Sequence, residues 1–346
     1  MAGTMKALVK TGAGPGASLQ QVPIPKPKPG EVLIKVTAAA ICGTDVHIYG
    51  WDQWSAGRIK PPLIFGHEFC GEIVELGEGV KDVPMGKLVT VEGHFVCGKC
   101  YYCRTGQGHI CQDVEIIGVD TDGCFAEYVV APAENVWVLD EDVPVEVGAI
   151  HDPYGNAVHT TLIDEVVGNT VLVTGCGPIG VAAVAIAKKA GASRVYATDV
   201  NEYRLDLALK MGADKVFNVS EVNMVEALME ETEGAGVDVL LEMAGHPSAI
   251  NDGFSVLRKG GWAALLGITP GKTVDIDLND GIIFKGATVY GINGRKMYHT
   301  WYKMQALLRA GLDLTPMITH RFKFEEFEKA FELASSGKSG KIILYP

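Results

Sequence analysis

The stretch Gly175-Cys-Gly-Pro-Ile-Gly180 decides the fold of this 346-residue chain. It fits the pattern G-x-G-x-x-G, whose glycines permit a tight turn, close approach of a pyrophosphate, and close packing of a helix on a strand. The β-branched run 171–174 precedes it, and the alanine-rich segment 181–190 follows. This order predicts a strand, a glycine turn and a helix whose N-terminus binds the phosphates of a dinucleotide.

An acidic residue, Asp199, stands at the end of the next apolar run, 195–198. Its carboxylate is expected to accept hydrogen bonds from the adenosine ribose, and a 2′-phosphate there would meet like charge. The sequence therefore favours NAD over NADP. Arg204 could stack on the adenine or pair with Asp199. If Asp199 only caps a helix and the glycines only form a turn, no dinucleotide binds, but the complete order of elements disfavours this alternative.

Strands and helices continue to alternate beyond this motif. Apolar runs at 237–241 and 263–267 are separated by helical segments, which predicts βαβ units and a parallel, doubly wound sheet. The first ~150 residues instead contain short apolar runs between glycine and proline turns, which is typical of β-rich structure. The uncharged segment 166–187 is long enough to suggest a membrane span, but its central glycines favour a strand, a turn and a helix.

Composition narrows the class of protein. Apolar residues make up 47% and charged residues 21%, which is ordinary for a soluble globular protein. The formal net charge of −12 argues against nucleic acid or an anionic membrane as a partner. The first twenty residues contain no apolar run behind a basic start, so we expect no secretory signal and a reducing cytoplasm. In a reducing compartment, closely spaced cysteines indicate a metal site more strongly than they indicate disulfides.

Four of the eight cysteines lie within fifteen residues, as Cys97-x-x-Cys100-x-x-Cys103 followed by Cys111. Four thiolates form the closed tetrahedral shell of a structural zinc ion, which leaves no open position for substrate. An iron–sulfur cluster is the competing interpretation, but no second cluster motif supports it. A zinc ribbon that binds nucleic acid is disfavoured by the acidic charge.

A second set of metal-ligating residues is spread along the first half of the chain. Cys42 and the pair His67-Glu68 offer a thiolate, an imidazole and a carboxylate, and a catalytic zinc needs about three protein ligands and an open position. Asp152 is a further acidic candidate at the expected domain junction, where a cleft between two domains would lie. Each residue alone would be unremarkable.

The order of Cys42, His67-Glu68, the four-cysteine lobe and G-x-G-x-x-G resembles the medium-chain zinc alcohol dehydrogenases over essentially the whole chain. The resemblance implies a β-rich, chaperonin-like (GroES-like) catalytic domain over 1–154 and 296–346, and a Rossmann NAD-binding domain over 155–295. It implies two zinc ions per chain, with Cys42, His67 and Glu68 at the catalytic ion and Asp152 at the last ligand position. Asp152 is shorter than the glutamate often found there, so it could instead act behind the ligands or in proton transfer.

The resemblance also implies a mechanism. A catalytic zinc ion would act as a Lewis acid on a substrate hydroxyl while NAD accepts the hydride. Thr44 and His47 match the family's proton relay, and the unperturbed pKa of histidine suits its outer end. The competing interpretation, in which Thr44 caps a helix and His47 is a surface residue, is weakened by the nearby Cys42.

The family's cofactor contacts fall at strand ends, where ligands gather in a Rossmann sheet. By resemblance they are Gly175, Gly177, Ile179, Gly180, Asp199, Arg204, Leu266, Gly267, Ile268, Gly291 and Ile292. Such enzymes usually form homotetramers.

Within the family, residues 152–160 and 290–304 resemble the branch that oxidises a hydroxyl-bearing amino acid. Such a small amino-alcohol substrate needs partners for its carboxylate and ammonium groups, and His94 and Arg295 are candidates. Two alternatives stay open: a polyol or butanediol dehydrogenase of the same fold, and a non-catalytic dinucleotide-binding protein.

Overall fold

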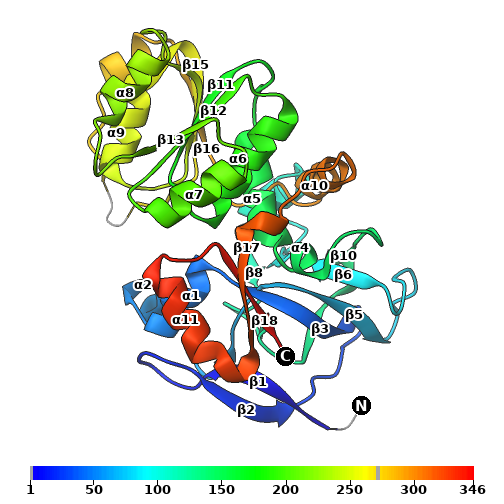
Figure 1. Cartoon of the computed structure of the whole chain (residues 1–346). Helices are drawn as coiled ribbons and strands as arrows, with labels where there is room; N and C mark the ends of the chain where they lie inside the picture. Colours follow the sequence, from blue (N-terminus) through cyan, green and yellow to red (C-terminus); the bar gives the residue numbers. More distant parts are fainter. Residues whose placement is uncertain (1–2, 270–272) are drawn as a thin grey trace. The chain divides into compact units, whose positions relative to one another are not determined.

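The computed structural model describes residues 3–269 and 273–346, and the chain divides into two compact units. The first unit comprises Met1–Asp152 and Ile318–Pro346, and the second comprises Pro153–Met317. In Figure 1 the end of the chain, drawn in red, rejoins the unit built from its blue beginning. The chain therefore leaves its first unit once, builds the second, and returns.

The return comes later than residue 296, where the sequence analysis placed it. Helix α10 (His299–Arg309) buries Trp301 and Met304. The hydroxyl of Tyr154, on helix α5 (His151–Thr161), donates a hydrogen bond of 2.9 Å to the backbone oxygen of Met304. Because α10 packs against residues that open the second unit, it belongs to that unit.

The second unit is built on a six-stranded parallel sheet with the order β13-β12-β11-β14-β15-β16. The strand order reverses between β11 and β14, which is the arrangement of a doubly wound Rossmann sheet. Every residue of β14 is buried, as expected for a strand covered on both faces. The strands are β11 (Thr170–Thr174), β12 (Arg194–Asp199), β13 (Lys215–Asn218), β14 (Val237–Glu242), β15 (Leu257–Leu265) and β16 (Thr288–Gly291).

Helices cover both faces of this sheet (Figure 1). Helices α6 and α7 contact each other and strands β11 to β13, whereas α8 and α9 contact each other, and α9 packs on β14. The predicted doubly wound fold is confirmed. These helices span α6 (Pro178–Ala190), α7 (Glu202–Lys210), α8 (Met224–Glu231) and α9 (Pro247–Val256).

The first unit is β-rich, as predicted. Its main sheet has the order β10-β6-β5-β3-β18-β17, with β9 also paired to β3, and two smaller sheets are β2-β1-β4 and β7-β8. The strands are β1 (Thr4–Lys10), β2 (Ser18–Pro23), β3 (Glu31–Ile41), β4 (Leu63–Ile64), β5 (Glu68–Leu76), β6 (Leu88–Val91), β7 (His94–Phe95), β8 (Glu115–Ile116), β9 (Tyr128–Pro132), β10 (Val136–Val138), β17 (Ile318–Lys323) and β18 (Lys341–Tyr345).

The last strand completes the main sheet. β18 pairs antiparallel with β3, where Ile342 faces Ile41, so a segment from the end of the chain lies beside one from its beginning. Phenylalanines from both parts, including Phe65, Phe125 and Phe331, meet in one buried cluster. The short helices of this unit are α1 (Gly43–Gly50), α2 (Gln53–Arg58), α3 (Tyr101–Arg104), α4 (Val145–Ala149) and α11 (Phe327–Ser336).

The uncharged segment 166–187 forms strand β11, the glycine turn and most of α6, as the sequence predicted. Within the residues that the structure describes, no helix combines the length and the apolar character needed to span a bilayer.

Candidate metal centres and dinucleotide site

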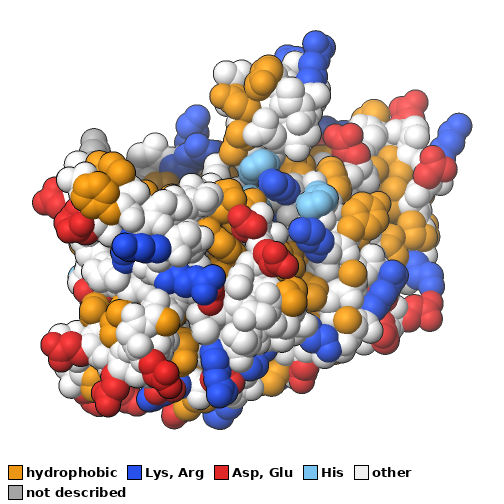
Figure 2. Space-filling model, turned by 90° about the horizontal axis from the view of Figure 1, so that it is seen from above, with side chains coloured by type: hydrophobic (Ala, Val, Ile, Leu, Met, Phe, Trp, Pro, Cys, Tyr) orange, Lys and Arg blue, Asp and Glu red, His pale blue; other side chains and the backbone are white. Residues whose placement is uncertain are grey.

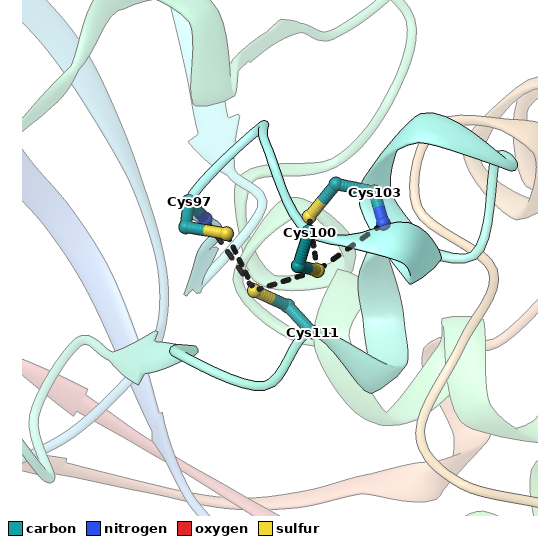
Figure 3. A group of neighbouring side chains, drawn as sticks. All are labelled: Cys97, Cys100, Cys103 and Cys111. Carbon is teal, nitrogen blue, oxygen red and sulfur yellow. Dashed lines mark hydrogen bonds between the residues drawn. The ribbon is translucent and has the colours of Figure 1, made fainter.

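The four lobe cysteines converge on one point (Figure 3). The sulfur of Cys111 lies 3.5 Å from that of Cys97 and 3.9 Å from that of Cys100, and Cys100 and Cys103 are 3.5 Å apart. A tetrahedron with zinc–sulfur bonds of about 2.3 Å has edges of about 3.8 Å. All four cysteines are free of disulfides, so the group fits a closed zinc shell.

Backbone amides prepare this lobe for negative charge. Cys100 caps α3, and its sulfur accepts a hydrogen bond from the amide of Cys103, while the sulfur of Cys111 accepts one from Asp113. Hydrogen bonding from the Cys103 amide is the main cause that lowers the pKa of the Cys100 thiol to about 6. A thiolate is the form that zinc binds, so the backbone favours a ligand state.

The second predicted group also comes together. The sulfur of Cys42 lies 3.2 Å from Nε2 of His67. Ligand atoms of His67, Glu68 and Asp152 lie within 4.8 Å of one another, and so do those of Cys42, Asp45 and His67. Cys42 precedes α1, His67 and Glu68 stand at the start of β5, and Asp152 opens α5. One thiol, one imidazole and carboxylates are a donor set that suits zinc.

Asp45 was missed by the sequence analysis. This fully buried carboxylate accepts a hydrogen bond of 2.9 Å from the amide of Cys42, in a capping box at the start of α1. Its other oxygen lies 3.7 Å from Nδ1 of His67. The two buried atoms are beyond hydrogen-bond distance, but a carboxylate that closes on a metal-ligating histidine would orient its ring. The Cys-x-x-Asp spacing is the signal that could have identified it.

Lys341 was also missed. Its ammonium group is buried and donates hydrogen bonds to Glu68 and to the backbone oxygen of Ile41, the latter at 2.8 Å. Burial raises the pKa of Glu68 to about 7, and the charges of Lys341 and His67 oppose that rise. Lys341 therefore keeps a negative charge possible at Glu68 in a buried position.

The two predicted relay residues lie on α1, three positions apart and hence on neighbouring turns. The amide of Thr44 donates to the sulfur of Cys42 at 3.2 Å. Nδ1 of His47 lies 2.7 Å from the carboxylate of Asp52, a third residue that the sequence analysis did not single out. His47 is 60% exposed, so it can exchange protons with solvent.

The two predicted substrate partners lie in different surroundings. His94 is in β7, just before the cysteine lobe, and its Nδ1 lies 2.8 Å from a carboxylate oxygen of Glu92. Arg295 is fully buried, and its guanidinium carbon lies 5.6 Å from the centroid of the Trp301 ring. The structure thus places Arg295 within the packing of the second unit.

The glycine motif forms the predicted turn between β11 and α6. Gly175 has a φ of +87°, a conformation that favours glycine, and Gly177 is the N-cap of α6. A Cβ on Gly180 would lie 1.9 Å from the backbone oxygen of Gly175, so only glycine allows this approach of helix to strand. Ile179 lies in the first turn of α6.

Asp199 ends β12 beside this turn. One carboxylate oxygen accepts a hydrogen bond of 2.8 Å from the amide of Cys176, and the other accepts one of 3.0 Å from Asn201. A guanidinium nitrogen of Arg204 lies 3.8 Å from Asp199, so the two form an ion pair. The remaining predicted cofactor residues follow the carboxyl ends of β15 and β16: Leu266, Gly267 and Ile268, and Gly291 and Ile292.

Comparison with known proteins covers both units. Residues 28–141 match the family of alcohol dehydrogenase GroES-like domains, and residues 178–310 match the zinc-binding dehydrogenase family. Among curated relatives, a protein named L-threonine 3-dehydrogenase from Symbiobacterium thermophilum is 51% identical over 348 residues, which is 100% of this chain and 99% of that protein. One of the same name from Bacillus licheniformis is 52% identical, with 100% of each chain covered.

Solved structures of dehydrogenases are also similar to this chain over its whole length. A zinc-binding dehydrogenase from Sinorhizobium meliloti bound to NADP matches with a TM-score of 0.91 at 30% identity, and the 2R,3R-butanediol dehydrogenase from Bacillus subtilis matches with 0.90 at 28%. Each match covers 99% of this chain and 99% of the other. The chain therefore belongs to the zinc-dependent medium-chain alcohol dehydrogenase family.

Proposed function

We propose that this chain oxidises the secondary hydroxyl of L-threonine to 2-amino-3-oxobutanoate with NAD, as a step of threonine catabolism. The observation that carries the proposal is full-length identity of about 50% to several proteins named L-threonine 3-dehydrogenase. The butanediol dehydrogenase of the same fold is 28% identical, so the polyol alternative has weaker support. Two clustered sets of zinc-ligating side chains also disfavour a non-catalytic dinucleotide-binding protein.

The catalytic zinc would be held by Cys42 and His67 together with the carboxylates of Glu68 and Asp152. When bound, a zinc ion supplies a Lewis acid that lowers the pKa of an alcohol oxygen. Burial and nearby carboxylates raise the pKa of the Cys42 thiol well above its usual value, and a cation beside it would oppose that rise. Asp45 would hold the His67 ring in its ligating orientation.

Asp152 remains a candidate for two roles. Its carboxylate lies within 4.8 Å of ligand atoms of both His67 and Glu68, a separation compatible with a shared metal ion. Lys341 donates a hydrogen bond to one oxygen of Glu68, and the metal would bind at the other side of that carboxylate. From the proximity of its carboxylate to both other ligands we infer that Asp152 ligates directly, with proton transfer as the alternative role.

Proton removal would follow α1. Thr44 stands two residues beyond the N-cap Cys42, and His47 lies about one turn later beside solvent. Asp52 accepts a hydrogen bond from Nδ1 of His47 when that nitrogen carries the proton, which leaves Nε2 to accept the proton from the relay. This assigns Thr44 to passing the proton and His47 to releasing it.

The preference for NAD would come from Asp199. Its carboxylate stands at the end of β12, where the adenosine ribose of a dinucleotide binds in a Rossmann fold. Arg204 pairs with Asp199, so its charge is partly neutralised and less available to a 2′-phosphate. Gly175, Gly177 and Gly180 would admit the pyrophosphate.

For the substrate, His94 is the better placed of the two predicted partners. Its side chain retains 18% exposure, whereas Arg295 is fully buried. Nδ1 of His94 lies 2.8 Å from a carboxylate oxygen of Glu92, a contact that orients the ring and leaves Nε2 for a substrate group. Arg295 would then act mainly by packing on Trp301.

We also infer a cytoplasmic homotetramer without a nucleic-acid or membrane partner. The net charge of −12 supports the absence of such partners, whereas the tetramer is inferred from the family alone. On the face in Figure 2, acidic and basic side chains are interspersed instead of gathered by sign. Sedimentation of the purified protein tests the tetramer, and a mass of one or two chains would contradict it.

Product analysis tests the proposed reaction. Purified protein incubated with L-threonine and NAD should form NADH and an equal total amount of 2-amino-3-oxobutanoate and the aminoketone that this β-keto acid yields when it loses CO2. NADH formed without either product, or no NADH at all with a zinc-loaded protein, would contradict the proposal.

A further inference from the structure

Glu242 stands at the edge of the Rossmann sheet where ligands bind. It ends β14 and lies directly opposite Thr174, the last residue of β11. The strand order reverses between these two strands, and the crevice outside their carboxyl ends is the binding position in open α/β sheets. From β11 the chain enters the glycine motif, and from β14 it enters the turn 243–245.

Glu242 joins three segments, two through its side chain and one through its backbone oxygen. Its Oε1 accepts hydrogen bonds from the amides of Ala244 (2.9 Å) and Gly245 (2.8 Å), and from the hydroxyl of Thr174 (3.4 Å). Its backbone oxygen accepts from Leu266 (2.9 Å) and Gly267 (3.1 Å). One fully buried residue thus connects the end of β11, the turn after β14 and the segment after β15.

The turn that Glu242 holds is wedged between two glycines of the expected cofactor site. A Cβ on Gly175 would lie 2.8 Å from Cα of Ala244, and a Cβ on Gly267 would lie 2.2 Å from the amide nitrogen of Gly245. Both contacts are backbone against backbone, so they cannot relax by a change of rotamer. Movement of the turn must therefore displace the glycine motif or residues 266–268.

Side-chain packing alone does not explain why residue 242 is a glutamate. Among residues 3–269 and 273–346, no lysine or arginine forms an ion pair with Glu242, and burial raises the pKa of the carboxyl. A buried charge without a cationic partner is costly, and an apolar side chain of similar volume would avoid that cost. What an apolar side chain cannot do is satisfy the amides of Ala244 and Gly245.

We propose that Glu242 is a positioning residue for the dinucleotide, whose carboxylate holds the turn 243–245 where it packs against Gly175 of the glycine motif and against Gly267. The inference rests on the proposed use of NAD. Glu242 touches no reacting atom in this account. It acts by keeping the phosphate-binding loop and the strand end in the geometry that NAD requires.

Direct measurement of NAD affinity tests this role. Titration calorimetry of Glu242→Ala in the zinc-loaded protein should give a dissociation constant for NAD at least about tenfold above the wild-type value. Glu242→Gln keeps an oxygen that can accept from both amides, so we expect it to stay within about threefold of wild type. The KM for L-threonine at saturating NAD should change little in both variants.

Asp238 provides a matched control at the other end of the same strand. Its carboxylate accepts hydrogen bonds from the amide (2.7 Å) and hydroxyl (2.5 Å) of Thr170, so it ties β14 to β11 as Glu242 does. Asp238→Ala should lower the unfolding temperature but leave the NAD dissociation constant within about twofold of wild type. If both alanine variants weaken NAD binding equally, or if neither does, the proposal is overturned.

Folding failure of the alanine variant would not prevent a decision. Glu242→Asp shortens the side chain by one methylene and removes the reach to both amides, so it should weaken NAD binding more than Glu242→Gln does. An unchanged NAD affinity in Glu242→Asp would contradict the proposal. If the wild-type protein itself fails to bind NAD, the proposed function is contradicted. If wild type and Glu242→Ala both bind NAD tightly, only the positioning role of Glu242 is contradicted.

Discussion

Lys341 donates a hydrogen bond to the buried carboxylate of Glu68, although 273 residues separate them in the sequence. The contact exists because β18 pairs with β3 and so lies close to the start of β5, where Glu68 stands. The end of the chain thereby supplies the counter-charge for a predicted zinc ligand.

Replacement of Lys341 should destabilise the protein strongly. In Lys341→Met the Glu68 carboxylate loses its cationic partner in a buried position, which typically costs about 3–5 kcal/mol. Comparison of urea unfolding midpoints of the metal-free proteins measures this. Lys329→Met is the control, because Lys329 is 72% exposed and pairs with Glu326 three residues earlier. Equal midpoints for the two variants would show that the buried pair contributes nothing.

Glu146 binds Arg321 of the C-terminal segment, and the contribution of this ion pair to stability should depend on pH. The bidentate hydrogen bond from Arg321 is the main cause that lowers the pKa of Glu146 below its usual 4.5. Because the folded pKa is the lower one, the contribution is fully present above pH 4.5 and is lost as pH falls through the folded pKa.

Glu146→Gln should therefore lower stability by about 1 kcal/mol at neutral pH, and the gap to wild type should close in acid. Thermal unfolding across that pH range measures it. Glu141→Gln is the comparison, since Glu141 is 86% exposed and pairs with the exposed Lys87, so its loss of stability should be smaller. A gap for Glu146→Gln that widens toward low pH would contradict this assignment.

The four-cysteine lobe should lose its metal when one ligand is removed. Cys100→Ser is expected to reduce the zinc content from two ions to one per chain and to lower the unfolding temperature, because a closed zinc shell contributes to folding. Cys176→Ala removes a buried thiol outside both metal groups and should keep both ions. Two zinc ions in Cys100→Ser would mean that the lobe does not bind zinc through four sulfurs.

Substitutions at the proposed catalytic zinc site should reduce activity by different amounts. Cys42→Ser should abolish activity while the fold remains intact. Asp45→Asn keeps an acceptor for the amide of Cys42 but removes the charge behind His67, so we expect a loss of about 10–100-fold in activity or zinc affinity. Steady-state rates and metal analysis measure both. Loss of folding in Cys42→Ser would mean that Cys42 is structural, and full activity in Asp45→Asn would exclude its orienting role.

Local spacing carried most of what the sequence could predict. The glycine motif and Asp199 belong to one βαβ unit, and the lobe cysteines lie in one loop, so short stretches specify each site. Cys42, His67, Glu68 and Asp152 are far apart, and only family resemblance grouped them before the structure did. Their positions depend on long-range strand pairing, which no local pattern encodes.

The residues that escaped prediction share that dependence. Lys341 reaches Glu68 only through the pairing of β18 with β3, and Glu242 gains its role from the reversal of strand order beside β11. The domain boundary expected at 296 differs from the observed return at Ile318 because Trp301 and Met304 of α10 are buried in the second unit. A helical pattern in the sequence does not say which unit the apolar face of a helix meets.

This enzyme oxidises L-threonine with NAD in preference to polyols. Measurement of kcat/KM for L-threonine, 2,3-butanediol and sorbitol by NADH absorbance with the zinc-loaded protein tests this preference directly. We expect a clear preference for L-threonine, and loss of activity with every substrate in Cys42→Ser. A higher kcat/KM for either polyol would contradict the assignment of L-threonine.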